Sequence, residues 1–279
     1  MALDCVQLGG VEVTRLMIGG NPFSGFSHQG ADRDREMRRY YTVDRIKAAL
    51  RKAEAAGITT LFARADNHVM RLLEEYWDEG GKLQWIAQTS AEIDNFKANI
   101  ARAAQRGASG VYLHGGQSDV FYHQGRTELY GEALEAVHAA GLAAGFAAHS
   151  PEPHEWINEH LSPDFHMVCY YDPSPRRDKP DHVVTDDEKF DPAHRDRMAR
   201  LISTLKAPAV HYKVLAAGRT EPRQAFEYVA GVLRPQDAVV IGVFLGDDED
   251  MIARDVALFE EVVQPAVAAR ASGAQAGAR

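Results

Sequence analysis

The chain has 279 residues, of which 45% are apolar and 25% are charged. That is enough for one large globular domain with a core of normal size. The formal net charge of -9 disfavours nucleic-acid binding, because neutralising phosphates requires a basic face. We expect the partner to be a small molecule or, in a homo-oligomer, another copy of the chain.

The sequence carries no mark of export or of membrane insertion. Its two cysteines, Cys5 and Cys169, form no CxxC pair, and this usage fits a reducing compartment. No basic region followed by an apolar run predicts a signal peptide. No stretch approaches the roughly 20 apolar residues of a membrane span. We therefore expect a cytoplasmic protein that does not bind membranes.

Short apolar runs alternate with amphipathic segments, which is typical of βαβ units and a parallel sheet. Strands are expected at residues 15–19, 59–63, 83–88, 110–113, 142–148, 165–170, 209–215 and 238–243. The helices that follow them are expected at residues 42–56, 69–77, 94–105, 128–140, 152–159, 192–205, 221–233 and 248–263. Eight strand–helix units favour a single (β/α)8 TIM barrel over an open sheet.

The barrel domain is expected to span residues 1–265, followed by a flexible tail at 266–279 that is rich in Ala, Gly and Ser. Two long stretches, 21–41 and 172–191, follow the first and sixth strands. Segments after barrel strands lie on the carboxyl-terminal face, where active sites form. We therefore expect lid-like loops there, with solvated insertions as the alternative.

Several segments resemble the aldo-keto reductase family and occur in the family's order. They are residues 8–20, 57–68, 112–114, 145–152, 211–219 and 240–251. Together they cover most of the chain, and their shared order is a stronger signal than any one of them. The resemblance implies a (β/α)8 barrel whose mouth carries a catalytic Asp, Tyr, Lys and His and binds NADP.

The positions that match the family's catalytic residues mostly hold other residues here, so the active site is divergent. Ala63 stands at the Asp position and His68 at the Tyr position. Gln88 or Thr89 stands at the Lys position, and only His114 matches. The family's proton relay therefore lacks its donor, unless His68 supplies the proton instead.

The loop after the eighth strand bears on the cofactor. The resemblance implies basic groups there for the 2′-phosphate of NADP, but residues 246–250 read Gly-Asp-Asp-Glu-Asp. Four consecutive carboxylates repel a phosphate monoester unless they are solvated or paired. Arg254 is the nearest cation, and the helix N-terminus adds some anion affinity. We therefore do not expect this loop to bind NADP, and we expect it to accommodate NAD only slightly better.

Histidines recur at the expected strand ends, at His68, His114, His149 and His211. Adjacent strands end at one barrel mouth, so His114 and His149 are candidate metal ligands, with His68 or Asp66 as a third. Imidazoles with a carboxylate suit a divalent zinc, iron or manganese ion. The alternatives are hydrogen bonding to substrate for the first pair, helix capping for His68, and a satisfied core group for His211.

Lys213 follows His211 by two residues, so we expect both on the same face of the seventh strand. A buried lysine is costly unless it is paired or functional. It is a candidate base, Schiff-base amine or anchor for a carboxylate or phosphate. A salt bridge with Asp172 is the structural alternative.

Other polar residues at expected strand ends are candidates for substrate binding. Asn21 follows two glycines, which allow close approach of the backbone to a ligand, although it also suits a turn before a proline. Arg64 and Asp66 either orient a polar substrate or bridge each other. Tyr171 either stacks on a sugar or packs in the core. The full set is Asn21, Arg64, Asp66, Gln88, Tyr171 and His211.

These observations favour an enzyme that acts on a small polar, carbohydrate-like substrate. The chemistry expected is metal- or histidine-assisted, of the lyase, isomerase or hydrolase type, with His114, His149, His68 and Lys213 as catalytic candidates. Two alternatives stay open. One is a divergent NAD(P)-dependent oxidoreductase, and the other is a non-catalytic binding barrel.

Overall fold

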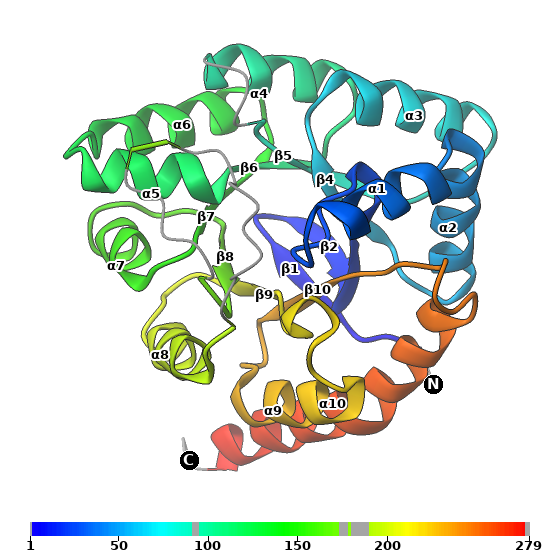
Figure 1. Ribbon diagram of the computed structural model, residues 1–279. Helices are drawn as coiled ribbons and strands as arrows, with labels where there is room; N and C mark the ends of the chain where they lie inside the picture. Colours follow the sequence, from blue (N-terminus) through cyan, green and yellow to red (C-terminus); the bar gives the residue numbers. More distant parts are fainter. Residues whose placement is uncertain (1, 91–94, 173–177, 180–189, 277–279) are drawn as a thin grey trace.

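The computed structural model describes residues 2–90, 95–172, 178–179 and 190–276, with side chains as far as Ser272. Its centre is a closed barrel of parallel strands in the order β10-β3-β4-β5-β6-β7-β8-β9. The helices form a ring around this barrel (Figure 1). The prediction of a single (β/α)8 barrel is confirmed.

Each strand of the barrel lies on a predicted apolar run. The strands are β3 (Leu16–Gly19), β4 (Thr60–Arg64), β5 (Gln84–Gln88), β6 (Gly110–Leu113), β7 (Ala143–Ala148), β8 (Phe165–Cys169), β9 (Ala209–Tyr212) and β10 (Ala238–Gly242). The first and last of them close the barrel, in a register that runs from Val239 opposite Leu16 to Gly242 opposite Gly19. The apolar runs are continuous because both faces of every strand are covered.

The ring around the barrel contains helices that the sequence predicts and two that it does not. The helices are α1 (Ala31–Tyr40), α2 (Val43–Ala55), α3 (Asn67–Asp78), α4 (Phe96–Gln105), α5 (Gly115–His123), α6 (Glu128–Ala139), α7 (Pro151–His160), α8 (Pro192–Ile202), α9 (Pro222–Val232) and α10 (Met251–Ala276). The unpredicted helices are α1 and α5. Short 3-10 turns, η1 (Pro22–Ser24) and η2 (Ala216–Gly218), lie after β3 and β9.

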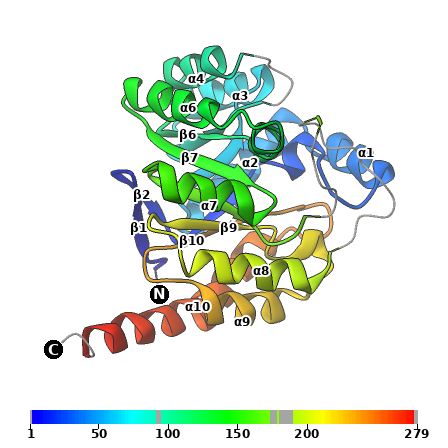
Figure 2. The same cartoon turned by 90° about the vertical axis from the view of Figure 1, so that its left-hand side faces the viewer.

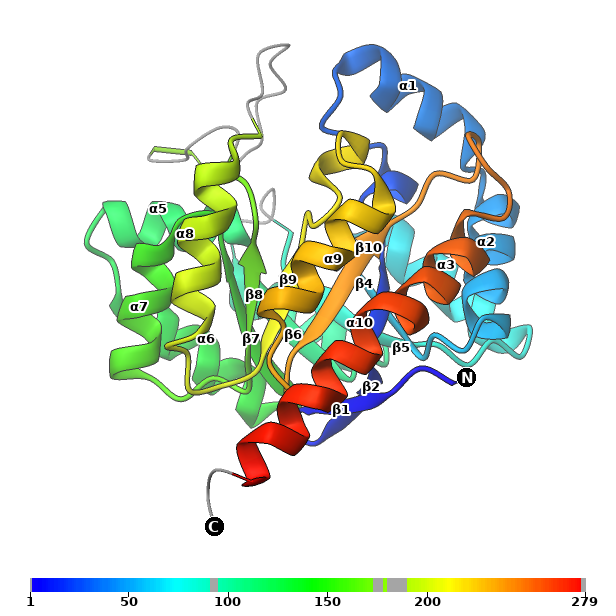
Figure 3. The same cartoon turned by 90° about the horizontal axis from the view of Figure 1, so that it is seen from below.

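A hairpin of β1 (Cys5–Leu8) and β2 (Val11–Thr14) precedes the barrel. Its turn residues Gly9 and Gly10 both have positive φ, 57° and 83°, as the preferred two-residue hairpin turn requires. Leu8 and Val13 are fully buried against the side chains inside the barrel. The hairpin therefore closes the barrel at the end opposite α1 (Figures 2 and 3).

The predicted lid-like loop at residues 21–41 is largely helical. It contains η1 and α1, which are joined by residues 25–30, and the buried residues of α1 are Asp34 and Met37. Because most of this helix is charged, its apolar periodicity is too weak to predict a helix from sequence. The other predicted loop, 172–191, lies mostly outside the described residues.

The segment expected to be a tail, from residue 266 onward, is helical as far as Ala276. Helix α10 continues through Pro265 to Ala276, since the segment is rich in alanine, the strongest helix former. Residues 277–279 lie outside the described part of the chain. Within the residues described, no helix has the length and apolar character that crossing a bilayer demands.

Candidate functional site

A cavity of about 360 Å³ lies at the carboxyl-terminal mouth of the barrel. Its floor is formed by side chains at the strand ends, including Phe62, Tyr112, Met167 and Tyr212. Segments after β3, β9 and β10 form its walls, and α1 contributes Met37. Figure 3 shows α1 and the loop between β9 and α9 at this same end of the barrel. We call this the mouth cavity.

Three of the predicted site residues line the mouth cavity: Asn21, Gln88 and Lys213. Gln88 ends β5 opposite Tyr112 of β6. Burial raises the pKa of the Tyr112 hydroxyl, and the nearby Gln88 amide only partly opposes that effect. The floor therefore offers a phenol that stays protonated and an amide, both suited to hydrogen-bonding a polar ligand.

Lys213 is the most unusual of the three. Its backbone has φ of 58°, because β9 ends at Tyr212 and the chain turns into the left-handed region. The Nζ atom is buried and has no hydrogen-bond partner among the described residues. The salt bridge with Asp172, expected as the structural alternative, is not formed. Burying an ammonium group without a counter-charge costs free energy. Lys213 is therefore a candidate for binding an anionic ligand.

The loop after Lys213 presents backbone donors to the same cavity. Val214, Leu215 and Ala217 line the cavity, and in the described structure their N–H groups donate to no backbone carbonyl. Ala216, Ala217 and Gly218 have φ of 48°, 53° and 81°. Successive N–H groups in such left-handed turns form concave anion-binding sites, termed nests.

Backbone strain is concentrated at this cavity. The non-glycine residues with positive φ in the described chain are His28, Lys213, Ala216 and Ala217. All of them line the mouth cavity except Ala216, which lies between two residues that do. Left-handed conformations cost about 1–3 kcal/mol each and cluster at functional sites. The strain therefore singles out the mouth cavity independently of its side chains.

Tyr212 and Cys169 lie beside Lys213 near the barrel axis. Burial raises the pKa of the Cys169 thiol, while the Lys213 charge and a hydrogen bond with Tyr212 act in the opposite direction. Burial likewise raises the pKa of Tyr212 well above its ordinary value. Tyr212 lines the cavity, so it can donate a hydrogen bond to a ligand and stays protonated at neutral pH.

The segment 26–37 covers one side of the cavity through contacts with the opposite rim. Arg33 forms an ion pair with Asp247 in the loop after β10 and lies over the ring of Phe244, 4.5 Å from its centroid. The side-chain amide of Gln29 donates to the carbonyl of Ala217 at 2.6 Å. Acidic Asp247 is thus paired rather than free.

The outer end of the cavity, at the start of α10, carries a buried carboxyl group. Asp255 lines the cavity with 1% of its surface exposed, and burial raises its pKa to about 6. Arg254 forms an ion pair with Asp248. The arginines of this end, Arg33 and Arg254, are therefore both engaged by carboxylates. Neither arginine is left without a carboxylate partner for the 2′-phosphate of NADP.

His149 lies at the end of β7, next to the cavity floor. Asp119 accepts from the His149 backbone N–H at 3.0 Å and lies 2.6 Å from the ring Nδ1. The ring packs edge-on against Tyr212, with centroids 6.4 Å apart. This buried His–Asp pair fixes the imidazole in one orientation beside a cavity residue.

The predicted histidine metal site is not assembled. His114 caps α5, its Nδ1 accepting the Gly116 N–H at 3.2 Å, and His68 is exposed on the first turn of α3. The described residues include no group of three or more His, Cys, Asp or Glu side chains that could hold a metal ion. The family-matched histidine thus has a local structural role.

Three other predicted substrate-binding residues lie outside the cavity lining. Asp66 caps α3 by accepting the Val69 N–H at 2.9 Å, and it lies 3.3 Å from the Nε of Arg64. Arg64 lies over the ring of Phe26, which does line the cavity. Tyr171 is buried and its ring packs against Phe190. These contacts are the ones that the bridging and packing alternatives describe.

His211 lies in the core outside the cavity lining, in the position that its structural alternative describes. It is fully buried, with its ring 2.9 Å from the Tyr170 hydroxyl and 3.4 Å from Asp237. Asp237 also pairs with Arg234 at 2.8 Å. His211 and Lys213 therefore do not share a face, because the strand ends between them.

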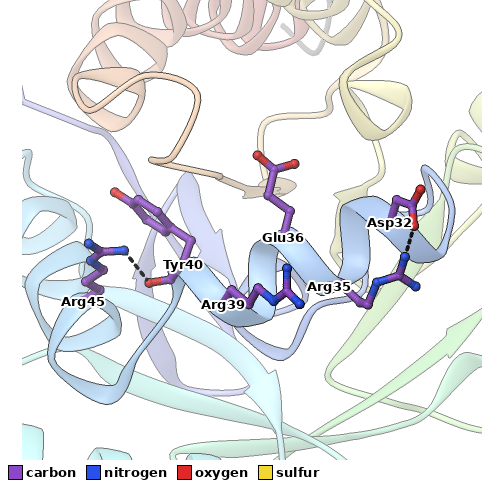
Figure 4. Close-up of a pocket in the computed structure, with 6 residues that line it drawn as sticks. All are labelled: Asp32, Arg35, Glu36, Arg39, Tyr40 and Arg45. Atoms are coloured by element: carbon purple, nitrogen blue, oxygen red, sulfur yellow. Dashed lines mark hydrogen bonds and ion pairs between the residues drawn. The ribbon is translucent and has the colours of Figure 1, made fainter.

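A second hollow, of about 560 Å³, lies on the outside of α1 (Figure 4). Arg35 pairs with Asp32 within it, and Arg45 donates to the carbonyl of Tyr40 at 3.1 Å. Its charges largely satisfy one another on an exposed surface. We therefore assign the functional site to the mouth cavity.

Sequence reasoning missed several cavity residues. Tyr212 stands between His211 and Lys213, and strand alternation alone identifies it as inward-facing. Asp255 lies on the buried side of α10, where helical periodicity marks a carboxylate as unusual. Arg33 lies in a segment of mixed charge, residues 33–39, which is typical of a solvated face. Pattern therefore identifies Tyr212 and Asp255, but it does not show that the three residues meet in one cavity.

Comparison with known proteins gives the fold. A putative aldo-keto reductase from Pseudomonas aeruginosa is 17% identical, with 93% of this chain and 96% of that chain covered and a TM-score of 0.60. For an aldo-keto reductase from Brucella melitensis the identity is 9%, the coverage 96% and 98%, and the TM-score 0.56. This chain has the aldo-keto reductase fold.

The same barrel also superposes on Yersinia pestis DHPS with a pterine–sulfa conjugate, at 12% identity, 96% and 99% coverage and a TM-score of 0.52. No family model and no curated protein matches the chain. Likeness at these identities shows the fold alone. The activity therefore has to be argued from the mouth cavity.

Proposed function

We propose that this aldo-keto-reductase-like barrel is an enzyme whose small polar substrate carries an anionic group. The observation that carries the proposal is the buried, unpartnered Nζ of Lys213 beside the cavity. The free N–H groups of Val214, Leu215 and Ala217 support it, since they add donors for the same anion. A carboxylate or phosphate would supply the missing counter-charge.

The chemistry proposed is lysine- and histidine-assisted, of the lyase, isomerase or hydrolase type. Lys213 and Tyr212 are the groups beside the substrate, and the Asp119–His149 pair stands behind Tyr212. Such groups can move a proton to or from a bound substrate. Ala63 stands at the reductase Asp position and Gln88 or Thr89 at the Lys position, which argues against hydride transfer by the familiar relay.

The test is turnover without nicotinamide. Purified protein is incubated with pools of hydroxy acids, oxo acids and sugar phosphates, and conversion is followed by NMR. We expect at least one substrate to be converted, and Lys213→Met to lower the rate at least 100-fold. Lys97→Met, which removes an exposed lysine paired with Glu132, is the matched control. An absence of turnover across the pools would count against an enzyme.

A second candidate is a divergent nicotinamide-dependent oxidoreductase. It is favoured by one observation: Asp247 and Asp248 are each paired with an arginine, so the acidic loop repels a nucleotide less than its sequence suggests. Fluorescence titration with NADH and NADPH distinguishes the two candidates. Saturable binding below millimolar concentration supports the oxidoreductase, and its absence supports the nicotinamide-independent enzyme.

A further inference from the structure

The two ends of the mouth cavity have opposite chemistry. The end formed by the loop after β9 offers donors, namely the Lys213 amine and the backbone N–H groups of Val214, Leu215 and Ala217. The end formed by α10 offers a carboxyl group, that of Asp255. A single ligand that occupies this cavity meets both ends.

The donor end lacks an anion. The Lys213 Nζ is buried without a partner in the described structure, and in the loop that follows it the N–H groups of Val214, Leu215 and Ala217 donate to no backbone carbonyl. A cation and a nest side by side bind a carboxylate or a phosphate through charge-assisted hydrogen bonds. One anionic group of the ligand belongs here.

The acceptor end excludes an anion. Asp255 has 1% of its surface exposed, and its nearest cation, the Arg254 guanidinium, lies 3.4 Å away in a long contact that it shares with Asp248. Arg33, the other nearby cation, is bound to Asp247. A second anionic group would face carboxylates whose counter-ions are already engaged. Hydroxyl groups, in contrast, can donate to Asp255.

The volume limits the size of the ligand. At roughly 30 Å³ for each liquid water, the cavity of about 360 Å³ holds the equivalent of ~12 waters. A six-carbon sugar acid or sugar monophosphate is of this order. Both carry one anionic group and several hydroxyl groups along a chain, which matches the polarity of the cavity.

We propose that the mouth cavity takes a polyhydroxy acid with a single anionic group, a sugar acid or sugar monophosphate, and that Asp255 selects against a second anionic group. The anionic group is bound at Lys213, and the hydroxyl end lies at Asp255. This inference rests on the proposed function for the location of the site and adds the class of substrate and the residue that sets specificity.

The test is calorimetric binding of ligands that share a carbon chain. Gluconate carries one carboxylate, glucarate two and glucitol none; glucose 6-phosphate and glucose 1,6-bisphosphate form the phosphate pair. We expect gluconate or glucose 6-phosphate to bind at least 10-fold more tightly than glucitol and than its own counterpart with two anionic groups. Which ligand with one anionic group binds separates the carboxylate source from the phosphate source.

Two variants test the roles of Lys213 and Asp255 at the two ends of the cavity. Asp255→Asn should bind the ligands with two anionic groups, glucarate and glucose 1,6-bisphosphate, at least fivefold more tightly, while Lys213→Met should lose the preference for gluconate over glucitol. Glu249→Gln removes the same charge as Asp255→Asn from an exposed position outside the cavity, so its selectivity should equal that of the wild type. Circular dichroism checks that each variant is folded.

The inference is wrong if glucarate binds as tightly as gluconate and the bisphosphate as tightly as glucose 6-phosphate. It is also wrong if none of the five ligands binds. Turnover of another substrate in the NMR pools would then still support the proposed function. Conversely, selective binding without any turnover would sustain this inference and count against an enzyme.

Discussion

His211 and Lys213 stand two residues apart at the end of β9, and both are polar groups in a buried setting. His211 belongs to a network in which Tyr170, Asp237 and Arg234 satisfy one another. The Nζ of Lys213 has no such partner in the described structure. A satisfied polar cluster stabilises the fold, whereas an unsatisfied one at a cavity marks a place for a ligand.

The largest expected effect comes from breaking the satisfied cluster. Burial opposes ionisation of Asp237, yet hydrogen bonds from His211 and Arg234 outweigh it and lower its pKa. Asp237→Ala leaves the Arg234 charge and the Ala209 N–H without this partner. We expect it to lower the free energy of unfolding by about 3–5 kcal/mol, measured by urea denaturation.

The control for this prediction is an exposed pair. Glu261→Ala removes the partner of Arg223 on the surface, and the expected cost is below about 1 kcal/mol. If the two substitutions cost the same, the network around His211 is not the stabilising cluster described.

A third buried cluster, His154 and His166, extends the comparison to groups without a counter-charge. Their Nδ1 atoms are 3.0 Å apart, and burial lowers the pKa of His154 from 6.5 to about 4. Both rings are neutral in the folded state at pH 7. As the pH falls below 6.5, His154 becomes protonated in the unfolded chain but not in the folded chain. The free energy of unfolding therefore falls until the pH reaches about 4.

We expect the protonation of His154 alone to lower the free energy of unfolding of the wild type by about 2 kcal/mol between pH 7 and pH 5. Urea denaturation at the two pH values measures this loss. His154→Gln removes the titrating group and should show a smaller change. An equal pH dependence in the variant would mean that the histidine pair does not control acid stability.

A smaller effect is expected at Gly115, which packs against the ring of His149. A Cβ there would lie 2.7 Å from Cε1 of His149, whose ring is held by Asp119. Gly115→Ala should therefore destabilise the fold by about 1–3 kcal/mol. Gly131→Ala is the matched control, because its Cβ meets nothing within 4 Å among the described residues and helix α6 gains about 0.5–1 kcal/mol. Thermal unfolding of both variants checks the difference.

The smallest effect is expected at the unsatisfied group itself. Lys213→Met replaces a buried, unpartnered amine with an apolar chain of similar length, so we expect stability to stay within about 1 kcal/mol or to rise. Ligand binding should nevertheless be lost. A loss of several kcal/mol in thermal unfolding would place Lys213 with His211 as a structural residue.

The barrel could be predicted because its strands are buried on both faces and read as continuous apolar runs. Helix α1 could not, since its cavity face is contributed by a few residues such as Met37. His114 and Asp66 looked like mouth residues by position, but each satisfies a helix N-terminus. Lys213 could be identified as a candidate because a buried lysine is costly unless it is paired or functional. Its orientation could not be predicted, because β9 ends one residue earlier, at Tyr212.

The pairing of β3 with β10 has a consequence for how the chain is made. Arg15, just before β3, donates to the carbonyl of Asp237, 222 positions later. During synthesis β3 therefore cannot pair with β10 until almost the whole polypeptide has been made. Closure of the barrel, and with it the complete mouth cavity, must be a late and slow event in folding.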